Sequence, residues 1–351
     1  MPIERVASAV RRSLPREQAS PFVLEFVGYH MQEKVMPGRL EGKVAIVTGA
    51  GRGIGRGEAL LLAQEGCRVV VNDLGGSPAG EGADQSPADE VVREIKKLGS
   101  DGVANYDNVA EMAGGERMVK QALDTFGRLD IVVNNAGILR DRMVFNMSEE
   151  EWDQVIAVHL KGHFTVTKHA ALVFRQQRSG RIVNTSSESG MGNMGQANYS
   201  AAKEGIVGLT RTLALDLGRY GVTANAIRPR AGTRLTLTPE LRAAMERARA
   251  ATRASGGAES TAGDTVMGQM DELKPELVAP LVVYLCTDKA ANINGRDFIA
   301  GGNEISLMSL PDKARTIYQP GGWTLDALDR VFASTIGAGI KNPMPAQEAK
   351  S

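Results

Sequence analysis

Residues 44–55 read Val-Ala-Ile-Val-Thr-Gly-Ala-Gly-Arg-Gly-Ile-Gly, an apolar run that passes directly into a glycine-rich turn. Glycines in such a turn remove side chains where the backbone must bend tightly and approach a pyrophosphate. A helix that begins near Ile54 would direct its free N–H groups and the positive end of its dipole at that anion. A glycine-rich turn alone can be purely structural, but one between a strand and a helix predicts a dinucleotide site. The residues expected to line it are Gly49, Arg52, Gly53, Ile54 and Gly55.

The same alternation of apolar runs and helical stretches continues from Gly42 to about Gly302. Most runs are β-branched and lack alternating polar residues, which is typical of strands buried on both faces of a parallel sheet. They occur at 44–47, 68–71, 131–133, 182–183 and 297–300, with helical stretches at 54–64, 88–98, 113–126 and 149–160. Strands that alternate with helices predict βαβ units. We therefore expect an α/β fold of the Rossmann type, a doubly wound, mostly parallel sheet of about seven strands in three layers.

Segments outside this alternation define the expected domain organisation. Residues 231–275 form a long insertion, with a helix around 240–252 and a loop rich in serine and glycine at 255–263. Because long loops in compact domains usually serve a function, the insertion is predicted to be a substrate lid. The expected parts are an N-terminal extension at 1–40, the Rossmann domain at 41–305 and a C-terminal tail at 306–351 with one helix at 324–334.

Charge and composition bound the class of function. The 351 residues carry 41 basic and 41 acidic side chains, whereas nucleic-acid binders usually carry a basic excess. Cys67 and Cys286 stand too far apart for a disulfide framework or a metal knuckle, which favours a reducing compartment. No apolar run reaches the roughly 18 residues of a membrane span. We expect a small-molecule substrate, with no nucleic acid, membrane span or metal.

The two ends of the chain bear on its location. The first 30 residues carry three glutamates among their arginines and lack a secretory apolar core, so a transit peptide is an open alternative to a surface helix. The chain ends in Ala349-Lys350-Ser351, which is not the Ser-Lys-Leu peroxisomal address. We therefore expect a cytoplasmic location.

An aspartate bears on the choice of cofactor. The second strand ends at Asn72-Asp73, and a carboxylate at this strand tip accepts hydrogen bonds from the adenosine ribose hydroxyls. It would also repel the 2′-phosphate of NADP, although Arg52 in the glycine turn could pair with that phosphate. No arginine follows Asp73 directly, so the sequence favours NAD over NADP. A turn aspartate without a ligand is the alternative.

Tyr199 and Lys203 are four residues apart in an expected helix, 198–211, so their side chains share one face. A free tyrosine has a pKa near ~10, too high for a base at neutral pH, and a neighbouring ammonium favours the phenolate. Tyr-x-x-x-Lys is common by chance, but here a strand that ends in Ser186-Ser187 lies just upstream.

With these motifs in this order, the chain resembles the short-chain dehydrogenase/reductase family over about residues 40–305. The motifs are Thr48-Gly49-x-x-x-Gly53-Ile54-Gly55, Asn134-Asn135-Ala136-Gly137, the Ser186/Ser187 strand end and Tyr199-x-x-x-Lys203. The resemblance implies an enzyme that transfers hydride between a secondary alcohol or ketone and NAD(H). It also implies a homodimer or homotetramer.

The resemblance assigns roles to individual residues. It implies that Tyr199 exchanges the proton with the substrate oxygen, while Lys203 holds the nicotinamide ribose and lowers the pKa of Tyr199. It implies that a serine hydrogen-bonds the substrate oxygen. The further residues expected at the cofactor are Asn108 and Val109, which meet adenine, and Asn135, Ala136 and Gly137, which line the site.

The position of the serine is ambiguous by one residue. Counting forward along the strand gives Ser187, whereas counting 13 residues back from Tyr199 gives Ser186. We favour Ser187, because strand register is harder to shift than loop length.

His159 stands where the wider family has a catalytic asparagine. It is counted among the catalytic candidates, because a histidine could relay protons or hold a water there. A packed histidine that bonds the backbone is the alternative. His159 and His163 have the spacing of metal ligands, but no acidic third ligand fits a known pattern, so no metal site is expected.

Four stretches, 70–76, 136–142, 192–203 and 273–276, are similar to one branch of the family. This branch comprises the dehydrogenase part of peroxisomal multifunctional enzyme type 2 and bacterial single-domain relatives that act on fatty or sterol side-chain acyl-CoAs. The likeness implies a (3R)-hydroxyacyl-CoA substrate. The alternatives are a hydroxysteroid dehydrogenase, a 3-oxoacyl-carrier reductase and a cofactor-binding scaffold without turnover.

An excess of arginines at 228–253 bears on the substrate. Only two glutamates oppose them, so they form either a solvated helix face or a landing patch for the phosphates of CoA. They are Arg228, Arg230, Arg234, Arg242, Arg247, Arg249 and Arg253.

Overall fold

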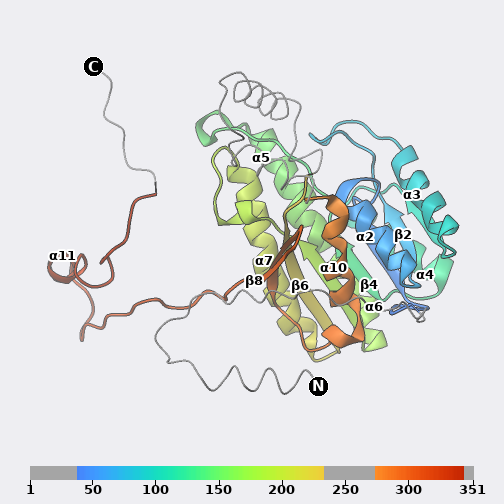
Figure 1. The fold of residues 1–351 in the computed structure, drawn as a ribbon. Coiled ribbons are helices and arrows are strands. Elements are labelled where there is room, and N and C mark those ends of the chain that lie inside the picture. The colour runs from blue at the N-terminus through green and yellow to red at the C-terminus, as the bar shows by residue number, and fades with distance from the viewer. Residues whose placement is uncertain (1–37, 233–272, 344–351) are drawn as a thin grey trace, which may run out of the picture. The chain divides into compact units, whose positions relative to one another are not determined.

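An eight-stranded sheet with the order β3-β2-β1-β4-β5-β6-β7-β8 forms the centre of the fold. Neighbouring strands are parallel except β7 and β8, which pair antiparallel. The chain runs outward from β1 to β3 and then returns to β4 beside β1, which confirms the predicted double winding (Figure 1). The strands are β1 Val44–Thr48, β2 Arg68–Asn72, β3 Gly102–Asn105, β4 Ile131–Asn134, β5 Gly180–Thr185, β6 Val222–Pro229, β7 Asp297–Gly301 and β8 Glu304–Leu307.

The computed structural model describes residues 38–232 and 273–343. These residues belong to one compact unit, Pro37–Ser351. The helix and loop predicted within the insertion at 231–275, and nearly all of the N-terminal extension at 1–40, lie outside the described residues.

β3 and β6 were not among the apolar runs found in the sequence, and neither was the last strand, β8. β8 returns along β7 after Gly302, whose φ of +54° lies in the left-handed region that favours glycine and allows a tight turn. β8 spans residue 305, so the sheet extends beyond the expected end of the Rossmann domain. Because β8 is a short edge strand, with Ile305 63% exposed, it lacks the continuous apolar run of the buried strands.

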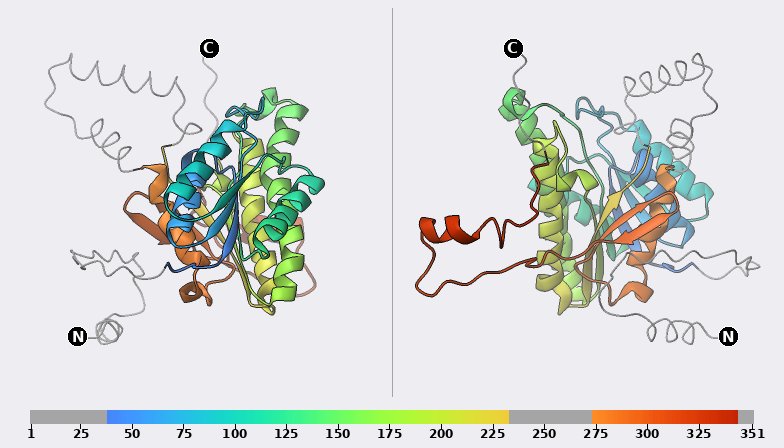
Figure 2. Two further views of the ribbon diagram at one scale, coloured as in Figure 1. Left: turned by 90° about the vertical axis from the view of Figure 1, so that its right-hand side faces the viewer. Right: turned by 60° about the vertical axis from the view of Figure 1, so that its left-hand side comes forward.

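Helices cover both faces of the sheet, which confirms the three predicted layers (Figure 2). Ala45 and Val47 of β1 pack in one apolar cluster with α2, α3 and α10, while Val44 and Ile46 pack in a second cluster with α4, α6 and α7. Successive strand residues point to opposite faces, so a strand with two covered faces must be apolar throughout. The helices are α2 Gly53–Gln64, α3 Ser86–Lys97, α4 Met112–Phe126, α5 Glu149–Ile156, α6 Gly162–Gln177, α7 Ala197–Gly218, α10 Ala279–Cys286 and α11 Leu325–Val331.

The helix expected at 149–160 is the first part of a longer helical segment. Ser148 and Glu151 form a capping box at its start, with each side chain accepting a hydrogen bond from the backbone N–H of the other. A π-helical turn, η2 (Ala157–Lys161), then joins α5 to α6. Such turns occur often at functional sites, and η2 carries His159.

The tail contains its predicted helix, α11, capped by the Thr324 hydroxyl, which accepts a hydrogen bond from Ala327 N at 3.2 Å.

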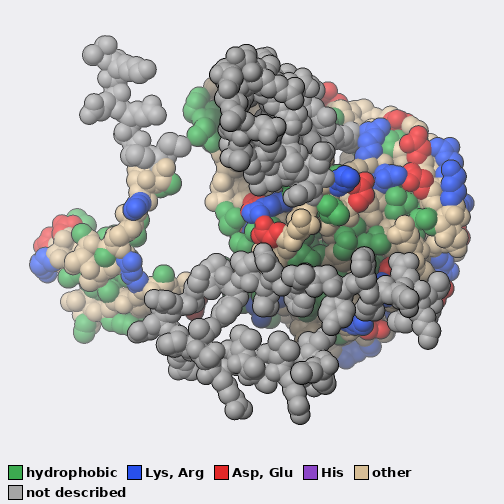
Figure 3. Space-filling view, in the orientation of Figure 1, with side chains coloured by type: hydrophobic (Ala, Val, Ile, Leu, Met, Phe, Trp, Pro, Cys, Tyr) green, Lys and Arg blue, Asp and Glu red, His purple; other side chains and the backbone are tan. Residues whose placement is uncertain are grey.

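Over α2 and α3, basic and acidic side chains are interspersed at the surface (Figure 3). An example is the 2.5 Å ion pair between Arg56 and Glu94. Among the helices at 38–232 and 273–343, none is both long and apolar enough to cross a bilayer.

Candidate active site

The predicted motifs meet at the carboxyl ends of the parallel strands. β1 and β4 are neighbours, but the chain continues from β1 toward β2 and from β4 toward β5. Open α/β sheets bind ligands in the crevice at such a switch point. The glycine turn follows β1, the Asn135-Ala136-Gly137 loop follows β4, and Ser186-Ser187 follows β5.

The glycine turn and the loop after β4 lock together. Asn135 Nδ2 donates to the carbonyls of Thr48 and Gly49 at 3.0 and 3.1 Å, and Thr48 Oγ1 accepts from the backbone N–H groups of Asn135 and Ala136. Gly49 has a φ of +63°, and a Cβ there would lie 2.8 Å from Ala136 Cα. No side chain caps the first turn of α2, so this turn can present backbone N–H groups to a phosphate.

Asp73 lies against the glycine turn. Its Oδ2 accepts a hydrogen bond from Gly51 N at 2.8 Å, and its Oδ1 accepts one from Gly75 N at 2.7 Å. The carboxylate therefore sits at the end of β2 in a fixed orientation, beside the predicted pyrophosphate position. Arg52 is exposed. Two hydrogen bonds from Ser86 lower the pKa of Asp84, and the charge of Arg52 adds to this lowering.

The residues expected at adenine follow β3. Asn108 Oδ1 accepts from Ala110 N at 3.0 Å, and the Val109 carbonyl accepts from Thr165 Oγ1 at 2.6 Å. Val109 is buried against Gly162 at the start of α6. Both residues thus stand on a short, well-anchored turn.

Tyr199 and Lys203 lie one turn apart on α7. Lys203 Nζ is 5.4 Å from the centre of the Tyr199 ring and donates to the Thr185 carbonyl at 2.6 Å. The lysine is buried, and burial lowers its pKa to about 7. The last carbonyl of β5 thus orients the ammonium beneath the phenol ring.

The pKa of Tyr199 departs from the expectation. Burial raises it to about 12, a hydrogen bond with Ser187 lowers it in part, and the charge of Asp141 adds to the rise. Lys203 is not among the causes of this shift, so the lowering expected from it is not observed. The physical reason is that Lys203 faces the ring and the Thr185 carbonyl, while the partly buried phenol is poorly solvated.

The two adjacent serines have different surroundings. Ser186 is fully buried, and its Oγ donates to the Lys203 carbonyl at 2.7 Å. Ser187 is half-buried, shares a hydrogen bond with the Tyr199 side chain, and accepts one from Ser189 N at 3.2 Å. Of the two hydroxyls, that of Ser187 is the one beside the phenol.

His159 bridges the loop after β4 to Tyr199. Its Nε2 lies 2.8 Å from the Ile138 carbonyl and 3.0 Å from Ile138 N, and its ring meets that of Tyr199 edge to face at 5.1 Å. Burial holds the pKa of His159 well below its usual range, so the ring is neutral. This is the packed, backbone-bonded alternative. The described residues contain no cluster of three or more potential metal ligands, and His163 is likewise buried, with its pKa lowered by burial to about 3.

Asn198 was missed in the sequence. It is fully buried, and its Nδ2 donates to the carbonyls of Arg140 and Glu151 at 3.0 and 2.9 Å. Its Oδ1 accepts from Tyr199 N at 2.7 Å. Asn198 therefore fixes the start of α7 against two other segments, and only its place next to Tyr199 could have drawn attention to it.

The sequence predicted that seven arginines at 228–253 form either a solvated helix face or a patch for CoA phosphates. Two of them, Arg228 and Arg230, form neither. Arg228 is 2% exposed and bonds Asp297 and Glu204, and Arg230 pairs with Glu188 and Glu304. The carboxylate partners of these two arginines are distant in sequence, so the ion pairs could not be seen from the sequence alone. The other arginines, Arg234, Arg242, Arg247, Arg249 and Arg253, lie outside the described residues.

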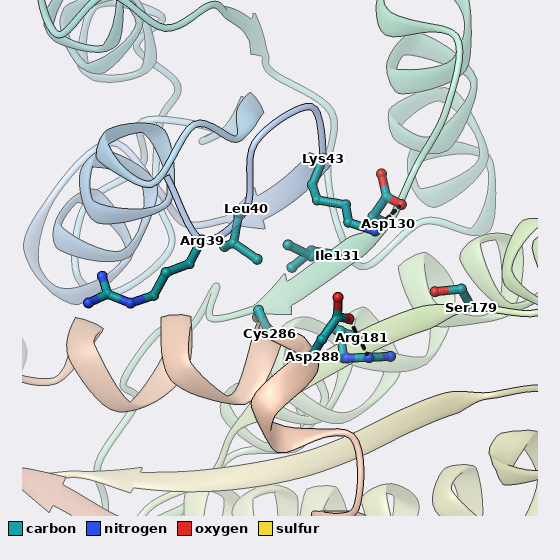
Figure 4. Close-up of a pocket in the computed structure, with 9 residues that line it drawn as sticks. All are labelled: Arg39, Leu40, Lys43, Asp130, Ile131, Ser179, Arg181, Cys286 and Asp288. Atoms are coloured by element: carbon teal, nitrogen blue, oxygen red, sulfur yellow. Dashed lines mark hydrogen bonds and ion pairs between the residues drawn. The ribbon is translucent and has the colours of Figure 1, made fainter. Parts of the chain in front are cut away.

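A small pocket in the described part of the chain lies at the amino ends of the parallel strands, opposite the candidate site at their carboxyl ends (Figure 4). Lys43 and Asp130 form an ion pair there at 3.7 Å, as do Arg181 and Asp288 at 3.2 Å. It contains none of the predicted site residues.

Comparisons with known proteins agree with this geometry. The family model for short chain dehydrogenases matches residues 43–243. The chain is 46% identical over 275 residues to peroxisomal multifunctional enzyme type 2 of Mus musculus, covering 78% of this chain and 33% of that protein. It is 45% identical over 289 residues to the hydroxyacyl-CoA dehydrogenase ChsB1 of Mycobacterium tuberculosis, covering 79% and 82%.

A solved structure extends the likeness to the fold. A short chain dehydrogenase from Mycobacterium avium superposes with a TM-score of 0.71 at 41% identity, covering 89% of this chain and all of that one. The chain belongs to the short-chain dehydrogenase family of oxidoreductases, as its motifs predicted.

Proposed function

We propose that the protein oxidises the 3-hydroxyl group of a 3-hydroxyacyl-CoA with NAD. The observation that carries this proposal is the convergence of Ser187, Tyr199 and Lys203 at the sheet edge that also holds the glycine turn. A serine hydroxyl and a tyrosine side by side can hold one substrate oxygen, and the phenolate form of the tyrosine can take up its proton. The intact set also argues against a scaffold without turnover.

In the proposed reaction, the carbinol C–H bond breaks with its electron pair, the hydroxyl proton passes to the phenolate form of Tyr199, and a carbonyl forms. NAD, when bound, would supply the acceptor for the hydride. Ser187 would hold the substrate oxygen beside the phenol. Lys203, oriented by the Thr185 carbonyl, would bind the nicotinamide ribose.

The residues present fit a dinucleotide. The uncapped first turn of α2 and the lack of side chains in the glycine turn suit a pyrophosphate. Asp73 supports NAD over NADP, because its carboxylate would accept from the ribose hydroxyls and repel a 2′-phosphate. His159 would act through its contact with Ile138, holding the loop that lines the cofactor.

The names of the relatives support a CoA thioester as substrate, since a hydroxyacyl-CoA dehydrogenase matches this chain over most of both lengths. A second candidate is a carrier-bound substrate. The 3-oxoacyl-[acyl-carrier-protein] reductase of Synechocystis is 47% identical over 191 residues, covering 54% of this chain and 74% of that protein. A cytoplasmic location and a homodimer or homotetramer stay predictions.

The test is NADH formation measured against hydroxyacyl-CoAs, carrier-bound thioesters, free hydroxy acids and hydroxysteroids. Tyr199→Phe should abolish turnover and keep NADH binding. Tyr220→Phe is the matched control, because Tyr220 lies beyond the far end of α7, among Arg175, Arg178 and Arg219. If CoA phosphates add binding energy, kcat/KM should be far higher for the thioester than for the free acid and should fall with salt. Equal values for acid and thioester would exclude the CoA assignment.

A further inference from the structure

A buried arginine holds the residue that begins the loop after β5. The side chain of Arg228, near the end of β6, is 3% exposed, and each of its three nitrogens donates one hydrogen bond. Nε donates to Asp297 Oδ2 at 2.7 Å, Nη2 to Glu204 Oε2 at 2.8 Å, and Nη1 to the Ser187 carbonyl at 2.8 Å. The guanidinium therefore connects β7, α7 and the Ser187 backbone.

The two carboxylates fix the direction of the third bond. A guanidinium is a rigid planar fork, so holding two of its nitrogens sets the position of the remaining one. Asp297 is itself buried, and Glu204 follows Lys203 directly on α7. The arginine thus aims at Ser187 from a position set by the helix that carries Tyr199 and Lys203.

The neighbouring residues are anchored to β6 as well. Ser186 N donates to the Ile227 carbonyl at 2.7 Å. Arg230 donates to both carboxylate oxygens of Glu188 at 2.6 and 2.7 Å. Because the Arg230 side chain is 39% exposed, solvent weakens that pair, and the buried Arg228 is the firmer contact.

We propose that Arg228 is a positioning residue for catalysis. It holds the Ser187 carbonyl and thereby keeps the Ser187 hydroxyl beside the Tyr199 phenol, while Glu204 and Asp297 hold Arg228 itself. This rests on the proposed catalytic role of Ser187. Displacing a reacting group by about 1 Å can cost about 10²-fold in rate, so a backbone contact behind the serine can control turnover.

The test compares Arg228→Lys with Arg181→Lys. Lysine keeps a positive charge between the carboxylates but lacks the fork that reaches three acceptors. Arg181 is the matched control, because it is buried on β5 and donates to the carbonyls of Gly180 and Gly221 at the amino ends of the strands (Figure 4). Arg228→Lys should lower kcat about 10- to 100-fold, with NADH affinity unchanged. Arg181→Lys should lower thermal stability alone.

Two further readouts separate positioning from general damage. The Ser187 hydrogen bond lowers the pKa of Tyr199, so Arg228→Lys should move the pH profile of oxidation to higher pH. In a Ser187→Ala background, Arg228→Lys should have almost no further effect on kcat. Glu204→Gln, at a half-exposed site, should give the same changes in smaller measure and carries the test if Arg228→Lys does not fold.

Several outcomes would overturn the proposal. Arg228→Lys could leave kcat unchanged, or lower it equally with and without Ser187, and then Arg228 would not act through the serine. If Ser187→Ala strongly lowers kcat in that case, the proposed function stands and only the positioning role fails. If Ser187→Ala itself retains full kcat, the catalytic role of the serine fails, and the positioning role fails with it.

Discussion

Replacing each of the adjacent serines by alanine should separate catalysis from stability. The Ser187 hydroxyl is hydrogen-bonded to Tyr199 and would hold the substrate oxygen. Losing one donor aimed at the reacting oxygen typically lowers kcat about 10²–10³-fold. Ser187→Ala should do so, and it should also shift the pH profile of oxidation upward, because the Ser187 hydrogen bond lowers the pKa of Tyr199.

Ser186→Ala should act on the folded state instead. Its hydroxyl is fully buried and donates to the Lys203 carbonyl at 2.7 Å, away from the phenol oxygen. Removing a typical buried hydrogen bond costs about 1 kcal/mol of unfolding free energy, so denaturant midpoints should fall while kcat changes little.

The assay is steady-state NADH formation over a pH series, with unfolding curves for each variant. Because the two residues are neighbours on one strand end, each serves as the control for the other. The reasoning is refuted if Ser186→Ala loses more kcat than Ser187→Ala, or if the pH profile of Ser187→Ala does not move.

Two further predictions concern carboxylates. Asp73→Ala should weaken NAD binding and reduce the preference for NAD over NADP in kcat/KM, and equal values for both cofactors in the unmodified protein would contradict the assignment. Glu58 is fully buried with neither oxygen bonded, and burial raises its pKa from 4.5 to about 8. The unfolded chain releases this proton near pH 4.5 and the folded protein only near pH 8, so the carboxyl lowers stability progressively over that window. Glu58→Met should therefore gain up to about 5 kcal/mol of stability above pH 8 and much less at acidic pH. An equal Tm gain at acidic and alkaline pH would count against this.

Local sequence pattern identified β1, β2, β4, β5 and β7, but not β3 or the buried β6, whose sequence Val222–Pro229 is interrupted by Thr, Asn and Arg. β1 must be apolar on both faces because helices cover both, and that requirement is visible in residues 44–48 themselves. The edge strand β8 has no such requirement, since one side of it is open. It was missed for that reason, although Gly302 marks its turn.

The site residues could be predicted where a short motif carries them, and their partners could not. Tyr199 and Lys203 are four residues apart, whereas Arg228 meets Asp297 across 69 residues. A pairing of that kind depends on the strand order, which brings β6 beside β7. The pKa of Tyr199 was misjudged similarly, because burial of the phenol arises from the packing of several segments.

The first turns of α7 show why the proposed proton transfer depends on the whole fold. Asn198 bonds the loop after β4 and α5, Tyr199 bonds Ser187, Lys203 bonds the Thr185 carbonyl, and Glu204 bonds Arg228. Helical spacing alone aligns only Tyr199 with Lys203. The remaining contacts reach different segments, so a rotation of α7 would break several of them together. These contacts therefore fix the register between α7 and the end of β5 together.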